Sequence, residues 1–133
     1  MEGVFQVGEH SLVFDDPELC LVTWGEHITT EEVRALHDEV KRRAEGNARV
    51  FVLCDASRVK SVESNARKAM ASLIDVKNLR GSVAFGMSFQ IRVAALLLIK
   101  LIELTGRLGS CPIRMFATRE EALAFIEELR RRA

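Results

Sequence analysis

The chain has 133 residues, of which 48% are hydrophobic and 29% are charged. This length fits one domain spanning residues 1–133, and the composition is typical of a soluble globular protein. Nineteen basic residues balance nineteen acidic residues, so the formal net charge is zero. A chain without excess charge lacks the broad field that holds nucleic acid or an anionic membrane. The basic runs at 41–43 and 130–132 either offset helix dipoles or form a local basic patch, and we expect no nucleic-acid partner.

The cysteines and the N-terminus favour a cytoplasmic protein. Cys20, Cys54 and Cys111 are widely spaced and odd in number, and no C-x-x-C pair occurs. We therefore expect reduced thiols rather than a disulfide framework or a metal site. The first ten residues have neither the basic region nor the apolar core of a signal peptide. No cofactor is expected.

Three short strands are predicted at the start of the chain, over residues 4–7, 11–15 and 19–25. Tight turns join antiparallel strands, so these three should form an antiparallel edge of a sheet. A helix follows, and Thr29 with Glu32 forms a capping box at its start. Its inner stripe has helical spacing and consists of Val33, Leu36, His37, Val40 and Ala44.

Strands and helices alternate over the rest of the chain. Residues 50–54 form an apolar run that is typical of a strand buried on both faces. A helix is expected at about 64–77, a strand at 81–87, a long apolar helix at about 89–105 and a strand at 111–118. Thr118 and Glu121 form a second capping box for the last helix. This alternation predicts an α/β fold with right-handed crossovers, a mostly parallel sheet and about four α-helices.

The helix predicted at 89–105 is the most apolar part of the chain. A transmembrane helix needs roughly twenty uninterrupted apolar residues, whereas Arg92, Lys100 and Glu103 interrupt this one. We therefore expect no transmembrane segment. The charged residues form a narrow stripe, which predicts a mostly buried helix between the sheet and a neighbour. Leu96 and Ile99 beside this stripe are candidates for a homodimer interface, or they pack beneath the last helix.

The order of elements, with Asp55 and a serine cluster after the buried strand, resembles the STAS fold of anti-sigma-factor antagonists. The end of the chain resembles the SpoIIAA-like branch of that superfamily, which is also likened to CRAL-TRIO lipid-binding domains. The matching residues are Arg114-Met115-Phe116, followed by the helix "TREEALAFIEEL". The resemblance covers about residues 19–132. It implies a STAS-like, mixed and mostly parallel sheet with an antiparallel N-terminal edge, and a non-enzymatic signalling module that binds a protein partner.

The resemblance also bears on the serines. In phosphorylatable antagonists the loop after the buried strand ends in D-S-S-G, and the second serine accepts the phosphate. Aligned without gaps, this pattern falls on Glu63-Ser64-Asn65-Ala66, and the leucine that follows it becomes Arg67. Asn65 therefore occupies the acceptor position, and by hypothesis it mimics a fixed unphosphorylated state. Ser64, and then Ser61, are the remaining candidate phosphoacceptors, since a helix N-terminus stabilises a phosphate. Both serines also suit ordinary capping.

Ligands of open α/β sheets bind at the carboxyl ends of the parallel strands. The residues expected to form a partner- or ligand-binding surface there are Asp55, Ser57, Glu63, Ser64, Asn65, Met87, Ser88 and Gln90. Backbone N–H groups at residues 86–90 suit a small anionic ligand, although Ser88 is also a plain N-cap candidate.

A small-molecule or lipid carrier of CRAL-TRIO-like type is the alternative function, which the branch's likeness to CRAL-TRIO domains implies; the concentration of Leu, Ile and Met at residues 87–104 also favours it. Such a site needs a cavity of a few hundred cubic ångströms, for which a chain of this length has little room. Catalysis is not expected. The three histidines lie on different early elements, and no nucleophile-elbow, zinc-protease or phosphate-loop motif occurs.

Overall fold

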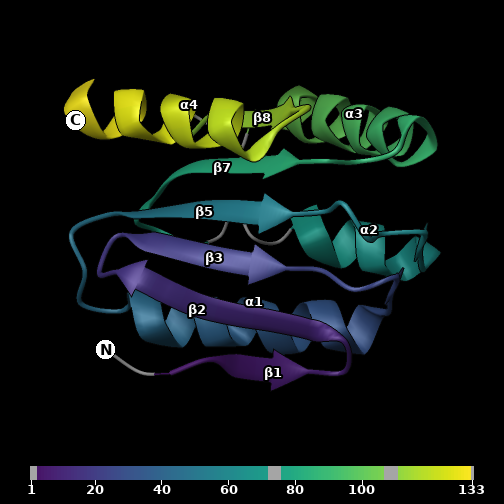
Figure 1. The fold of residues 1–133 in the computed structure, drawn as a ribbon, viewed down its shortest axis with the longest axis horizontal. Helices are drawn as coiled ribbons and strands as arrows, with labels where there is room; N and C mark the ends of the chain where they lie inside the picture. Colours follow the sequence, from purple (N-terminus) through teal and green to yellow (C-terminus); the bar gives the residue numbers. More distant parts are fainter. Residues whose placement is uncertain (1–2, 72–75, 107–110, 133) are drawn as a thin grey trace.

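The structure, a computed structural model, describes residues 3–71, 76–106 and 111–132. Six strands form one mixed sheet in the order β1-β2-β3-β5-β7-β8 (Figure 1). The strands are β1 (Phe5–Val7), β2 (His10–Asp16), β3 (Leu19–Thr23), β5 (Val50–Asp55), β7 (Leu79–Phe85) and β8 (Ile113–Phe116). The helices are α1 (Thr30–Ala44), α2 (Ser64–Ala71), α3 (Phe89–Leu104) and α4 (Arg119–Arg132).

The pairing of the strands confirms the mixed sheet. β1, β2 and β3 are antiparallel neighbours, as their tight connections require. β3 then pairs with β5 in parallel, and β5 with β7 and β7 with β8 also pair in parallel. Each parallel pair is joined by a crossover through a helix, so the carboxyl ends of β3, β5, β7 and β8 lie along one edge of the sheet.

β5 is the centre of the molecule, and its side chains alternate between two cores. Val50 and Val52 pack on the side that α1 covers, in a cluster with Leu36 and Val40. Phe51 and Leu53 pack on the opposite side against α4, in a cluster that includes Ile126. The residues from Val50 to Leu53 are at most 1% exposed, which confirms a strand buried on both faces.

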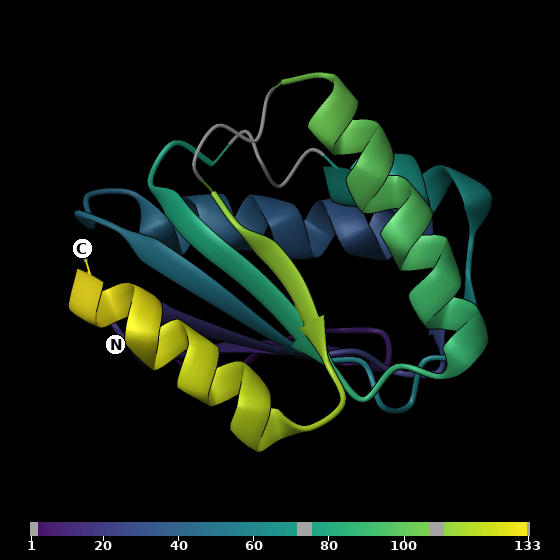
Figure 2. The same ribbon diagram turned by 90° about the horizontal axis from the view of Figure 1, so that it is seen from above.

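The helices divide between the two faces of the sheet. α1, α2 and α3 lie on one side, and α4 lies alone on the other side (Figure 2). Both predicted capping boxes are present: Thr29 with Glu32 begins α1, and Thr118 with Glu121 stands at the start of α4. Because α4 lies on the opposite face, the expectation that Leu96 and Ile99 pack beneath the last helix is wrong.

Helix α3 is less buried than its sequence predicts. Ile102 is its only buried residue, and six large apolar side chains are exposed: Phe89, Val93, Leu96, Leu97, Leu101 and Leu104. The apolar composition predicted a sheet on one side and a neighbour on the other, but within the described part of the chain no element covers the outer side. The prediction of a mostly buried helix is therefore wrong for this single chain.

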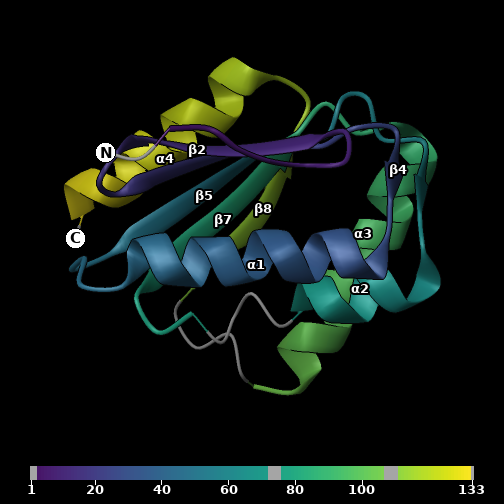
Figure 3. The ribbon, with the colours of Figure 1, turned by 90° about the horizontal axis from the view of Figure 1, so that it is seen from below.

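Two features differ from the predicted elements. β4 (His27–Ile28) and β6 (Ser61–Val62) pair in parallel as a separate two-stranded sheet beside the start of α1 (Figure 3). They were missed because two-residue strands carry no period-2 pattern. The helix expected at about 64–77 is described as far as Ala71, and residues 76–78 form a turn outside it. Residues 72–75 of the expected helix lie outside the described residues.

Candidate functional site

The loops after β5 and β7 meet at one edge of the sheet. The Ala56 N–H donates to the Phe85 carbonyl at 3.0 Å, and Gly86 lies so close to Ser57 that a Cβ on Gly86 would come within 2.9 Å of the Ser57 Cβ. Gly86 also has a φ of +81°, which an L-residue with a side chain rarely adopts. We call residues 55–65 and 86–90 the rim.

Asp55 and Ser57 are held in a local turn of the rim. One Asp55 carboxylate oxygen accepts hydrogen bonds from the Ser57 backbone N–H at 2.9 Å and from the Ser57 hydroxyl at 2.6 Å. Aspartate and serine side chains commonly bond to the backbone two residues away in this manner. Ser57 remains exposed, whereas Asp55 is half-buried, so this turn presents a hydroxyl whose position is fixed.

The candidate phosphoacceptors lie in different surroundings. The Ser61 Oγ is in β6 and lies 2.6 Å from His27 Nδ1. Ser64 is the first residue of α2, and Ser64 and Asn65 are both exposed there. Glu63, which precedes the helix, accepts a 2.6 Å hydrogen bond from the Thr30 hydroxyl and so links α2 to the start of α1. Ser64 is therefore the accessible hydroxyl at a helix start.

The residues after β7 divide between the surface and the interior. Ser88 caps α3, because its hydroxyl accepts the Ile91 backbone N–H at 3.4 Å. Gln90 is exposed. Met87 is only 9% exposed and lies in a cluster with Val33, Ala66 and other apolar residues. The structure thus places Met87 inside the protein and the other predicted rim residues at or near the surface.

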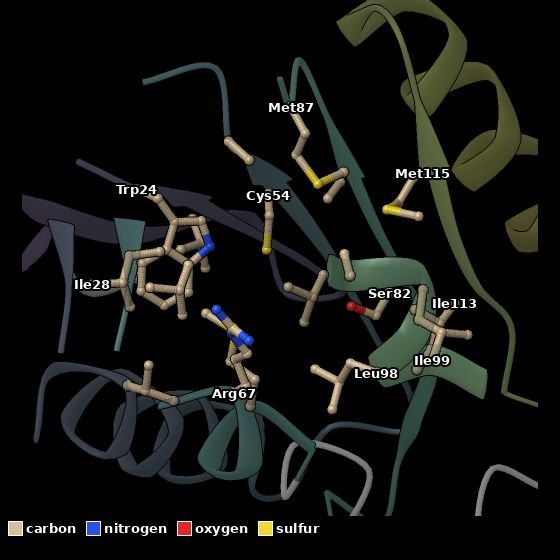
Figure 4. Close-up of a pocket in the computed structure, with 18 of the residues that line it drawn as sticks. Trp24, Ile28, Cys54, Arg67, Ser82, Met87, Leu98, Ile99, Ile113 and Met115 are labelled. Carbon is tan, nitrogen blue, oxygen red and sulfur yellow. The ribbon is translucent and has the colours of Figure 1, made fainter. Parts of the chain in front are cut away.

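An apolar cavity of about 230 Å³ lies beneath α3, between the sheet, α1 and α2 (Figure 4). It is partly open to solvent. Its walls include Val52 and Ala84 from the sheet, Leu36 from α1, Met70 from α2 and Ile102 from α3.

Few polar side chains line this cavity. Trp24, Cys54 and Ser82 lie on the sheet side, and Arg67 extends from α2 into the cavity (Figure 4). The Arg67 guanidinium forms no ion pair or hydrogen bond with a residue that the structure describes. In the sequence, Arg67 is distinguished only because it replaces a leucine of the antagonist pattern. His37, expected on the inner stripe of α1, also lines the cavity and is half-buried.

The cysteine environment matches unreactive thiols. All three cysteines are free; Cys20 is buried, and Cys54 and Cys111 are half-buried. Burial raises the pKa of the Cys54 thiol to about 11 despite the opposing hydrogen bond from Trp24, and burial also raises the pKa of Cys20. A raised pKa keeps a thiol protonated at neutral pH, and the protonated form is a poor nucleophile and metal ligand.

A second hollow, of about 380 Å³, separates α3 from the edge strand β8. Leu96 and Ile99 line it together with Lys100 and Arg114. Leu96 is 45% exposed, and Ile99 is half-buried and lines the apolar cavity as well. The two candidate dimer residues therefore lie on the β8 side of α3.

Across residues 3–71, 76–106 and 111–132, no three His, Cys, Asp or Glu side chains gather in a way that could hold a metal ion. Within the same ranges, none of the helices combines the length and the apolar character that crossing a membrane requires.

Comparison with family models places residues 20–130 in a domain of unknown function, DUF7793. The chain belongs to the DUF7793 family. No curated protein sequence matches this DUF7793 chain.

Solved structures share the fold. The anti-sigma factor antagonist SpoIIAA in its unphosphorylated form superimposes with a TM-score of 0.60 at 16% identity, covering 89% of this chain and 97% of that chain. The phosphorylated form of SpoIIAA, a Bacillus cell fate determinant, gives a TM-score of 0.52 at 15% identity, covering 88% and 98%. An uncharacterised DUF3478 protein from Shewanella loihica PV-4, described as having a SpoIIAA-like fold, gives 0.59 at 11% identity, covering 92% and 90%. The DUF7793 domain therefore has the SpoIIAA, or STAS, fold that its sequence predicted.

Proposed function

We propose that this DUF7793 chain is a non-enzymatic regulatory module of the cytoplasm that binds a protein partner through its rim. The observation that carries the proposal is the contact between Ser57 and Gly86, which joins the two strand-to-helix loops into one surface. Ser57, Ser64 and Asn65 are exposed on that surface. The solved relatives with this fold include an anti-sigma factor antagonist, a regulatory protein, and this supports the same class of role.

Regulation of the module would act at the start of α2. Ser64 is exposed and begins the helix, so a phosphate there would meet unpaired backbone N–H groups and the positive end of the helix dipole. Ser61 is the second candidate, although its hydroxyl lies 2.6 Å from His27 Nδ1. Asn65 presents an amide at the position where phosphorylatable antagonists have the acceptor serine, which suits a constitutive binder.

Affinity capture from the native cytoplasm tests the rim. The parent chain is compared with Ser64→Asp and with Gln6→Glu, which adds the same charge at an exposed residue of edge strand β1. A partner retained by the parent and by Gln6→Glu but reduced with Ser64→Asp supports binding at the rim. If all three chains retain the partner equally, a charge at residue 64 does not affect binding, and this contradicts binding of the partner at the rim. Scoring phosphate on Ser64 in the same sample tests the modification.

The apolar cavity favours a second candidate function, a carrier of an apolar small molecule or lipid. A chain of this length was expected to have little room for a cavity, yet about 230 Å³ lies beneath α3. The lining is predominantly apolar and contains a few polar groups, which is the usual composition of small-molecule sites. Native mass spectrometry distinguishes the candidates, since a retained apolar ligand supports the carrier and a bare dimer supports the module.

Self-association of the module would use the stripe of α3 that carries Leu96 and Ile99. A two-fold axis near the middle of the helix would pair two copies of α3 antiparallel, because a two-fold interface is self-complementary. That arrangement sets Arg92 of one copy opposite Glu103 of the other, and Leu96 opposite Ile99. Charge complementarity and the 45% exposure of Leu96 support this pairing.

A further inference from the structure

The charges around the apolar cavity have one sign. Arg67 and Arg114 line it, and none of the described lining residues carries a carboxylate. The Arg114 Nη1 already donates to the Ile113 carbonyl at 3.0 Å. Arg67, by contrast, is an exposed residue whose guanidinium bonds to no described residue, and it points into the cavity from α2 (Figure 4). The cavity thus combines apolar walls with an unpaired cation.

An unpaired guanidinium beside apolar walls favours an anionic ligand group. Arg67 is an exposed residue, so its guanidinium is accessible to a ligand that enters the open cavity. A guanidinium offers a planar fork of donors that fits a carboxylate or a phosphate with two parallel hydrogen bonds. The apolar walls would meanwhile cover a hydrocarbon chain, because burial of apolar surface is favourable.

We infer that the cavity binds an anionic amphiphile, with the anionic head on Arg67 and the hydrocarbon chain beneath α3. This inference rests on the carrier function proposed above. A water molecule occupies about 30 Å³ in the liquid. If a methylene takes about that volume, a cavity of 230 Å³ holds a chain of roughly eight carbons. The matching ligand class is a medium-chain carboxylate or alkyl phosphate.

Calorimetric titration with octanoate, octyl phosphate and 1-octanol tests the head group while the chain length stays constant. Charged hydrogen bonds predict that octanoate binds the parent on the order of tenfold more tightly than octanol. Arg67→Leu should remove this difference and keep octanol binding. The control is Lys68→Leu, the same change at the next exposed residue of α2, which is not a lining residue; it should keep the difference. Octyl phosphate shows whether the head group is a carboxylate or a phosphate.

The outcomes separate this inference from the carrier proposal. Equal binding of octanoate and octanol by the parent overturns the anionic ligand and leaves an apolar carrier. A preference for octanoate that survives in Arg67→Leu overturns the assignment of Arg67. Absence of binding by all three probes overturns the inference and the carrier together, while the rim proposal stands. Circular dichroism verifies that Arg67→Leu is folded, and Arg67→Gln serves as the polar replacement if it is not.

Discussion

Ser57 and Gly86 lie in direct contact although 29 positions separate them in the chain, and this contact holds the two loops of the rim together. A side chain at Gly86 would meet the Ser57 Cβ at 2.9 Å, which is closer than two carbon atoms approach without a shift. The geometry of the rim therefore depends on the absence of a side chain at residue 86.

We expect Gly86→Ala to destabilise the fold by about 2–4 kcal/mol, from the left-handed φ and from the contact with Ser57. Gly46→Ala is the matched control, because Gly46 has a φ of +87° but nothing within 4 Å of its Cβ position. It should cost only about 1–2 kcal/mol. Urea denaturation of both variants measures the difference, and equal losses would show that the contact between the two loops contributes nothing.

Glu32 has two roles that can be separated from each other. Its carboxylate completes the capping box of α1, and its Oε1 lies 2.9 Å from Nε2 of His10, which is 0% exposed. The Gly25 N–H donates to Nδ1 of His10 at 2.8 Å, so Nε2 carries the proton and donates to Glu32. Glu32→Ala would remove the cap and leave a buried N–H without an acceptor.

We expect Glu32→Ala to destabilise the protein by about 2–4 kcal/mol, the sum of a lost cap and an unsatisfied buried donor. Glu121→Ala removes the corresponding residue of the exposed capping box of α4 and should cost only about 1 kcal/mol. Thermal or urea unfolding compares the two. A loss in Glu32→Ala no larger than that in Glu121→Ala would mean that the hydrogen bond to His10 adds no stability.

The sheet could be predicted from sequence because local signals agree with the tertiary fold. The apolar run of residues 50–53 has no polar position to expose, so it had to lie inside a covered sheet. Each capping box sets the start of a helix through residues only three positions apart, and both boxes are present, at Thr29 and Thr118. Such signals are local, and tertiary packing does not alter them here.

The cavity and the exposure of α3 could not be predicted in the same way. Hydrophobic periodicity shows that a helix is apolar, but it does not show whether a second element covers it. Leu97 and Leu101 have the character of core residues, yet each is 62% exposed. Arg67 was identified only as a departure from the antagonist pattern, because the direction of its side chain depends on how α2 packs against α1 and α3.

Glu39 makes stability depend on pH. Its Oε2 accepts hydrogen bonds from Arg42 at 2.6 Å and from Arg43 at 2.7 Å. The bond from Arg42 first, and then that from Arg43, lowers the pKa of Glu39 to about 2 against the opposing effect of burial. A carboxyl with a lower pKa in the folded state adds stability above its unfolded pKa, near 4.5, and loses it as pH falls toward 2.

We therefore expect Glu39→Gln to be less stable than the parent at pH 7, with the difference shrinking between pH 4.5 and 2. Urea titrations at several pH values between 2 and 7 measure this difference. Glu31→Gln, at an exposed residue of the same helix, is the control. A difference that stays constant over this range would show that the pairing with Arg42 and Arg43 does not couple to folding.

The proposed self-association through α3 can be measured by sedimentation. Leu96→Glu places a carboxylate where two antiparallel copies of α3 would meet, so the sedimenting mass should fall from dimer to monomer. Val4→Glu makes the same type of change at an apolar residue that is 63% exposed outside α3, and the dimer should persist. A parent chain that is already monomeric at high micromolar concentration would contradict the pairing.

Filling the apolar cavity should separate ligand binding from folding. Ala95 lies on the cavity side of α3, whereas Leu97 on the same helix points to solvent and is 62% exposed. A phenyl group at residue 95 occupies part of the 230 Å³, and a filled cavity commonly adds about 0.5–2 kcal/mol to stability. We expect Ala95→Phe to unfold at a higher urea concentration than the parent.

The same substitution should weaken the binding of 1-octanol, because the added ring takes the volume that the hydrocarbon chain would fill. Leu97→Phe adds a ring on the solvent side of α3 and should leave both stability and octanol binding close to those of the parent. Calorimetry on the three chains gives the comparison. If Ala95→Phe bound octanol as well as the parent while remaining folded, the hydrocarbon chain would bind somewhere other than beneath α3.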